Sequence, residues 1–143
     1  MARGLGVGFI VTLVALFFTD LQIHSYTVTI SIVVITSVFF SMAGFINAVY
    51  ANTFDDISII PTFLLTPLIY LGGVFYSTDL LPEFWADVSK ANPILYIVNA
   101  FRYGVLGISD INVSWAFVMV AVFTLVAYFF SLWLLNSGKS LRQ

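Results

Sequence analysis

The sequence predicts an all-α protein: a polytopic membrane helix bundle of four transmembrane helices, with a re-entrant pair of short helices before the last span. Only 8% of the 143 residues are charged and 61% are hydrophobic, whereas a soluble domain carries about 25% charged residues. Backbone groups in lipid must bond to one another, which favours helices. We expect 1–143 to form a single transmembrane domain, whose predicted crossing runs are 4–19, 27–51, 57–78 and 115–135.

The first run, 4–19, is short for a crossing helix. At ~1.5 Å per residue it covers ~24 Å, less than the ~30 Å hydrocarbon core. It is not typical of a cleaved signal peptide, because no small-x-small cleavage site precedes the polar break that begins at Asp20. Its length and position lead us to expect the C-terminal part of a longer membrane protein, a truncated product, or one piece of a split one.

The second run, 27–51, carries small residues at three- or four-residue spacing: Ser37, Ser41, Gly44 and Ala48. Small side chains let two helix backbones approach closely in a bilayer. This face therefore predicts contact with another helix of the bundle. A face that lines a substrate path is the alternative interpretation.

The third run, 57–78, is interrupted by proline and glycine. Pro61 lies in the first turns, where proline costs little, whereas Pro67 lies mid-span and removes a backbone hydrogen bond. We expect a kink near Pro67 and a second soft point at Gly72 and Gly73. This helix is therefore a candidate moving part, and a static kink is the alternative interpretation.

Two carboxylates, Asp55 and Asp56, stand at the start of this third helix. They face the positive end of its dipole, which favours a helix cap and a membrane-surface anchor. Contact with a cytoplasmic partner is the functional alternative.

The segment 81–107 contains two helix starts but no run long enough to cross. Pro82 suits the first position of a short interfacial helix, and the pair Asn92 and Pro93 suits the cap and first position of another. The apolar run 94–106 covers ~20 Å, which is too short to span the hydrocarbon core. We therefore predict a re-entrant hairpin that dips in from the outer face.

Arg102 is the one strong charge predicted at membrane depth. Charged residues at that depth pair with a partner or mark a transport path. One interpretation is an arginine that snorkels to the interface or pairs structurally, with Asp110, Asp87 or Glu83 as the partner, and the other is a place in the path. The candidate gate or pathway residues are Pro67, Gly72, Gly73, Asn92, Pro93 and Arg102.

The last run, 115–135, indicates how the bundle is oriented. Trp115 and Trp133 lie ~27 Å apart along a helix, which matches the distance between the two interfacial aromatic belts. Lys139 and Arg142 follow the run, so the C-terminus is expected in the cytoplasm. Four crossings then place both termini there.

Four stretches resemble the membrane subunit of bacterial type-2 ABC transporters, the permease class that exports drugs, polysaccharides and lipids. They are TFDDISIIPTFLLTPLIYLGGVFYS at 53–77, LPEFW at 81–85, NPILY at 92–96 and FRYGVLG at 101–107. Together they cover the third predicted helix and the re-entrant pair.

The resemblance implies a six-helix permease in the bacterial inner membrane, where two permease copies assemble with two separate ATP-binding-cassette ATPase subunits. The chain is similar to the last four helices and the re-entrant pair. The family's main ATPase-contacting segment lies between helices two and three, outside that part. The resemblance also implies that substrate passes between two copies and that this chain has no catalytic residue, cofactor or metal of its own.

Other functional classes fit the sequence less well. The chain has no cysteine and a single histidine, His24, so neither thiol nor metal chemistry is indicated. Gly138, Lys139 and Ser140 resemble the end of a Walker A loop, but Trp133 stands where that motif needs its first glycine. The net charge of −2 does not suggest nucleic acid.

Two membrane alternatives need ionisable residues inside the bilayer. An ion-coupled secondary carrier depends on charged residues there, and an intramembrane enzyme needs a paired nucleophile and base or a metal cluster, whereas the four crossing runs contain no charged residue. A non-coupled fragment, or a structural or assembly subunit of the membrane, is the remaining alternative to an export permease.

Overall fold

The computed structural model describes most of the chain. The described residues are 6–11, 13–14, 23–51, 53–74, 80 and 82–137. Within these ranges the chain forms helices joined by turns, with no strand. Residues 6–11 and 13–14 are helical. The rest of the first predicted run, together with Asp20, Lys139 and Arg142, lies outside the described residues.

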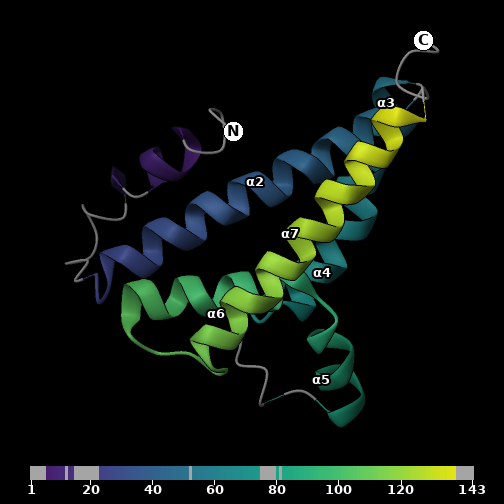
Figure 1. The fold of residues 1–143 in the computed structure, drawn as a ribbon. Helices are drawn as coiled ribbons and strands as arrows, with labels where there is room; N and C mark the ends of the chain where they lie inside the picture. Colours follow the sequence, from purple (N-terminus) through teal and green to yellow (C-terminus); the bar gives the residue numbers. More distant parts are fainter. Residues whose placement is uncertain are drawn as a thin grey trace.

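Three helices pack together as the core: α2 (Tyr26–Tyr50), α6 (Pro93–Leu106) and α7 (Val113–Asn136). Figure 1 shows α2 and α7 running beside each other, with α6 across the pair. Among the described residues, α2 and α7 are the helices long and apolar enough to cross a membrane. The residues of the shared apolar cluster are Ile32, Leu95, Tyr96, Ala100, Ala116 and Val120.

Both ends of α6 follow the signals in the sequence. Asn92 is its N-cap and accepts a hydrogen bond at Oδ1 from the backbone N–H of Ile94 (3.0 Å), and Pro93 is its first residue. Gly107 ends the helix at φ 74°, a left-handed conformation that glycine adopts without strain. The predicted start at Asn92 and Pro93 is confirmed.

The short helix α5 (Glu83–Lys90) precedes α6 and projects from the bundle (Figure 1). Phe84 and Trp85 are exposed and meet edge to face, with ring centroids 5.3 Å apart. Lys90 Nζ donates to the Asp87 carboxylate at 2.7 Å, and this hydrogen bond raises the pKa of Lys90. Exposed aromatic and charged side chains on one short helix are typical of a membrane interface.

The third predicted run folds as one helical segment in three consecutive parts. They are α3 (Phe54–Ile60), the π-helical turn η1 (Pro61–Leu65) and α4 (Thr66–Leu71). We call residues 54–71 the proline helix. In the view of Figure 1, α4 lies partly behind α7.

The proline helix is shorter than the predicted run 57–78. It ends at Leu71, Gly72 and Gly73 form the turn that follows, and Gly73 has φ 71°. The prediction of a soft point inside the helix at these glycines is therefore wrong. A left-handed glycine stops the helical repeat, so the glycine pair terminates the helix.

The irregular part of the proline helix begins at Pro61 and ends just before Pro67. Proline lacks an N–H and its ring crowds the carbonyl four residues earlier, whereas a π-helical turn holds an extra residue in the ladder. The sequence predicts a kink near Pro67 and little effect at Pro61. In the structure the distortion begins at Pro61 and not at Pro67. The π-helical turn lies between the two prolines.

Candidate gate at the end of the proline helix

Asn92 joins the end of the proline helix to the start of α6. Its Nδ2 donates to the main-chain carbonyl of Leu68 at 2.6 Å, while its Oδ1 caps the N–H of Ile94. The side chain is fully buried, with Asn92 2% exposed. The last carbonyls of a helix have no partner inside the helix. One amide therefore satisfies the C-terminal end of α4 and the N-terminal end of α6 together.

Arg102 makes a second contact to the same end of the proline helix. Its guanidinium donates to the carbonyl of Gly73 at 2.6 Å and to the carboxylate Oδ2 of Asp110 at 3.1 Å. The side chains of Arg102 and Asp110 are 22% and 17% exposed. Of the three partners that the sequence allows for Arg102, the structure selects Asp110. We call the hydrogen bonds to Leu68 and Gly73 the carbonyl contacts.

Asn99 positions the acidic partner of Arg102. This fully buried amide accepts at Oδ1 from the backbone N–H of Asp110 (2.9 Å) and from the hydroxyl of Ser109 (3.3 Å). Its Nδ2 donates to the carbonyl of Leu95 at 3.0 Å. Asn99 is not among the predicted site residues. The sequence did contain a signal for it: Asn99 is an amide inside an apolar run, and a buried amide needs a hydrogen-bond partner.

Gly72 allows the proline helix to approach α6 closely. A Cβ at Gly72 would lie 2.7 Å from Cγ2 of Ile94, closer than real side chains come. Pro93, next to Ile94, is half-buried. The structure thus brings Gly72, Gly73, Asn92, Pro93 and Arg102 together, and Pro67 lies beside the Leu68 carbonyl that Asn92 binds.

The other end of α6 is fastened to α2 by backbone contacts. The N–H of Ser25 donates to the carbonyl of Gly104 at 2.8 Å, and the N–H of His24 donates to that of Val105 at 3.2 Å. A Cβ at Gly104 would collide with the backbone and hydroxyl of Thr29. Close backbone approach at a glycine is a strong mode of helix packing in membranes.

His24 covers this junction from the outside. Its ring meets that of Tyr103 edge to face, with centroids 5.3 Å apart. The ring also lies over Gly107, where an added Cβ would come within 3.1 Å of it.

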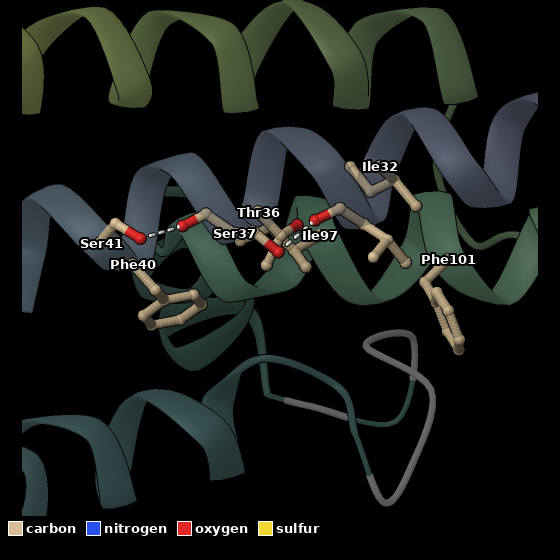
Figure 2. A pocket seen from close by; sticks show the side chains of 8 residues that line it. Ile32, Thr36, Ser37, Phe40, Ser41, Ile97 and Phe101 are labelled. Carbon is tan, nitrogen blue, oxygen red and sulfur yellow. Dashed lines mark hydrogen bonds between the residues drawn. The ribbon is translucent and has the colours of Figure 1, made fainter. Parts of the chain in front are cut away.

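Cavities lie along α6 in the described part of the chain, and two of them reach residues of the candidate gate. The largest, about 540 Å³, opens between α2 and α6 (Figure 2). A cavity of about 350 Å³ lies between α2, the proline helix and α6, and one of about 400 Å³ lies beside Arg102. Phe40 borders the first and second cavities, and Phe101 borders the first and third. These volumes are in the range of ligand pockets, ~300–1,000 Å³.

Small polar residues of α2 line the largest cavity. Figure 2 shows the Ser37 hydroxyl donating to the carbonyl of Val33 (2.8 Å) and the Ser41 hydroxyl to that of Ser37 (2.7 Å). The hydroxyl oxygen of Thr36 is buried without a partner in the described structure. Gly44 has nothing within 4 Å of an added Cβ. No described helix therefore packs against Gly44, although the spacing predicts a helix contact for this face.

Asp55 and Asp56 lie far along the proline helix from the carbonyl contacts, in the first turn of α3. Thr53 caps this turn: its hydroxyl accepts from the N–H of Asp56 (3.2 Å), and the Asp56 carboxylate accepts from the N–H of Thr53 (3.0 Å). This capping box confirms the predicted cap role of Asp56, whereas the part of Thr53 was not predicted. Asp55 is exposed.

The arrangement holds the end of the proline helix on α6 through main-chain carbonyls. Within the described ranges no group of three or more His, Cys, Asp or Glu side chains is placed to hold a metal ion. The Asn92 amide and the Arg102 guanidinium donate to the main-chain carbonyls of Leu68 and Gly73. These two hydrogen bonds form only when the end of α4 lies against α6.

Comparison with known proteins identifies relatives of this chain. A family model described as ABC-2 type transporter matches residues 1–106. The chain is 51% identical over 144 residues to the inner membrane transport permease YadH of Escherichia coli strain K12, and the match covers 100% of this chain and 56% of that protein. The protein of the same name from Shigella flexneri is equally similar.

A more distant relative is nodulation protein J of Rhizobium leguminosarum bv. viciae. It is 23% identical over 105 residues, which is 73% of this chain and 40% of that protein. The chain thus spans about half the length of the curated relatives it matches. No solved structure matches it.

Proposed function

The chain belongs to the ABC-2 type transporter family, and from this premise we propose that it serves as the membrane permease part of an ATP-binding-cassette exporter, with the proline helix as its gate. A separate ATPase subunit supplies the energy, and this chain supplies the path. The permease is not itself an enzyme, and it resides in the bacterial inner membrane.

The carbonyl contacts are the observation that carries this proposal. The end of the proline helix is held on α6 by Asn92 and Arg102 through hydrogen bonds of 2.6 Å each. A net contribution of ~0.5–1.5 kcal/mol is typical of one hydrogen bond, and ~1.5–3 kcal/mol when one group is charged. Their sum is comparable to the few kcal/mol that separate the two states of a switching protein, so binding of ATP to a partner can break them.

The proposed topology has four crossings with both termini in the cytoplasm. The first run, α2, the proline helix and α7 cross the membrane, while α5 and α6 enter from the outer side and return. The length and apolarity of α2 and α7 support two of these crossings. Two observations support the re-entrant pair. α5 and α6 are separate short helices, and the 14 residues of α6 are too few to cross the hydrocarbon core.

The proposed partners follow from this topology. Asp55, exposed at the cytoplasmic start of the proline helix, is a contact for the ATPase subunit, so that a push there reaches the carbonyl contacts through the helix. A second copy of the permease completes the path across the bilayer. The adjoining cavities along α6 support a route past Phe40 and Phe101 toward Arg102.

Co-purification from bacterial membranes tests the proposed partner and side of contact. A tagged permease should retain an ATP-binding-cassette ATPase in mild detergent, and Asp55→Arg should weaken that association several-fold. Glu83→Arg is the matched control, because Glu83 is also an exposed acid in a first helical turn but lies at the proposed outer face. Loss of the ATPase with Glu83→Arg and not with Asp55→Arg contradicts the proposal.

Impermeant thiol labelling tests the re-entrant pair. Cysteines placed at exposed Asp87 and Ile108, on either side of α6, should both react from outside intact cells, and one at exposed Thr53 should react only after permeabilisation. Protection of Ile108→Cys in intact cells means that α6 crosses the membrane and contradicts the topology.

A further inference from the structure

The proline helix has another polar contact with the bundle, near its α3 end. Asn47 of α2 donates from Nδ2 to the main-chain carbonyl of Ile57 at 3.0 Å. In a regular α-helix that carbonyl accepts from the N–H four residues later. The residue at that position is Pro61, which has no N–H to give.

We infer that Asn47 supplies the hydrogen bond that Pro61 cannot, and that it thereby positions the π-helical turn Pro61–Leu65 against α2. The side chain of a neighbouring helix thus repairs the backbone ladder at the point where the proline interrupts it. Asn47 is a positioning residue, because it acts through the backbone of the proline helix and not on a substrate.

The surroundings of Asn47 agree with this role. Asn47 and Pro61 line the same cavity of about 350 Å³ between α2 and the proline helix, so few side chains hold the two helices together there. The Oδ1 atom of Asn47 is buried and has no partner in the described part of the chain. The Ile57 carbonyl is therefore the group that orients this amide.

The hydrogen bond from Asn47 matters because the helix lies in a bilayer. Lipid offers no water to an unpaired carbonyl, and helices in lipid gain no hydrophobic drive from packing, so hydrogen bonds between helices are one of the forces that associate them. Together with the carbonyl contacts of Leu68 and Gly73, the Ile57 contact holds the proline helix by its main chain at three levels. Its importance for transport rests on the proposed function, but the replacement of the missing N–H does not.

Hydrogen–deuterium exchange of the intact chain in lipid nanodiscs tests the inference. Asn47→Leu should speed exchange across α3 and η1 about tenfold, as expected for the loss of one hydrogen bond. Adding Pro61→Ala restores an N–H in register with the Ile57 carbonyl. The double variant should therefore return to within about twofold of the parent.

Pro67→Ala is the matched control. It also restores an N–H to the proline helix, but in register with a different carbonyl, so Asn47→Leu with Pro67→Ala should stay as fast as Asn47→Leu alone. Equal rescue by both alanines means that the effect is general helix stabilisation and overturns the inference. Unchanged exchange in Asn47→Leu overturns it too, because another group then satisfies the Ile57 carbonyl. None of these outcomes depends on an ATPase or on transport.

Discussion

The core helices and the proline helix are held in place by different means. α2, α6 and α7 share buried apolar side chains and a close backbone approach at Gly104. The proline helix has no buried side chain among its described residues, and side-chain donors from α2 and α6 hold its main chain. Packing determines one stable arrangement, whereas a few hydrogen bonds can be exchanged. This contrast supports the proposal that α2, α6 and α7 form a fixed frame and that the proline helix is the element that moves.

The accepting carbonyls explain why the proline helix can be held this way. Ile57 precedes Pro61 by one helical turn, Leu68 lies in the last turn of α4, and Gly73 lies in the turn after it. At these places proline or the end of the helix leaves carbonyls without an internal partner. The residues that make the helix irregular also create the positions at which Asn47, Asn92 and Arg102 bind it.

The largest effect is expected from the frame. Gly104→Val should lower the free energy of unfolding by about 3 kcal/mol, because its side chain meets the backbone of Thr29 on a tightly packed face. Gly44→Val is the matched control, since Gly44 is also a helical glycine but nothing lies within 4 Å of its added Cβ. Denaturation in detergent measures both. Equal losses at the two positions contradict a frame built on close approach at Gly104.

A smaller loss of stability is expected at Asn92, and it has two parts: the cap of α6 and the contact to Leu68. Asn92→Ala removes both the cap of α6 and the contact to Leu68, at a combined cost of about 2–3 kcal/mol. Asn92→Ser keeps a capping oxygen but is too short to reach Leu68, so it should cost about 1–2 kcal/mol. Hydrogen exchange in Asn92→Ser should rise in α4 and stay near normal at the start of α6. A rise confined to α6 means that Asn92 serves only as a cap.

The smallest effect is expected from Arg102→Lys. The charge remains, but a single ammonium lacks the fork that reaches Gly73 and Asp110 together. Stability should fall by about 1 kcal/mol, with faster exchange at the end of α4 and little change in α2 or α7. Arg102→Met leaves the Asp110 carboxylate without its cation and should cost more than the lysine variant. If lysine and methionine cost the same, the charge of residue 102 does not matter.

Sequence patterns predicted the start of α6 better than the contacts between the helices. The start of α6 at Asn92 and Pro93 follows from local capping chemistry, which a short stretch of sequence contains. Asp110 was one of three acidic residues predicted as partners of Arg102. It could be predicted because it lies only eight residues from Arg102 along the chain. The carbonyls of Leu68 and Gly73 could not be chosen, since every residue has one and tertiary approach decides which is reached.

Backbone departures from the regular helix were also hard to predict. The glycine pair after Leu71 was predicted to soften a helix that in fact ends there, because local pattern does not show whether a glycine will be left-handed. The π-helical turn reflects two prolines acting on one turn, and proline rules describe each separately. Asn99 and Asn47 were overlooked because an amide in an apolar run does not reveal which backbone group it meets.

Distances between spin labels test the movement of the proline helix most directly. The chain contains no cysteine, so labels can be placed at Ile69 on α4 and Leu106 on α6, both exposed. The control pair is Leu106 on α6 and exposed Leu125 on α7. In membranes containing the assembled transporter, ATP should shift the α4–α6 distance and leave the α6–α7 distance unchanged. An unchanged α4–α6 distance, or an equal shift in both pairs, contradicts a gate that moves against a fixed frame.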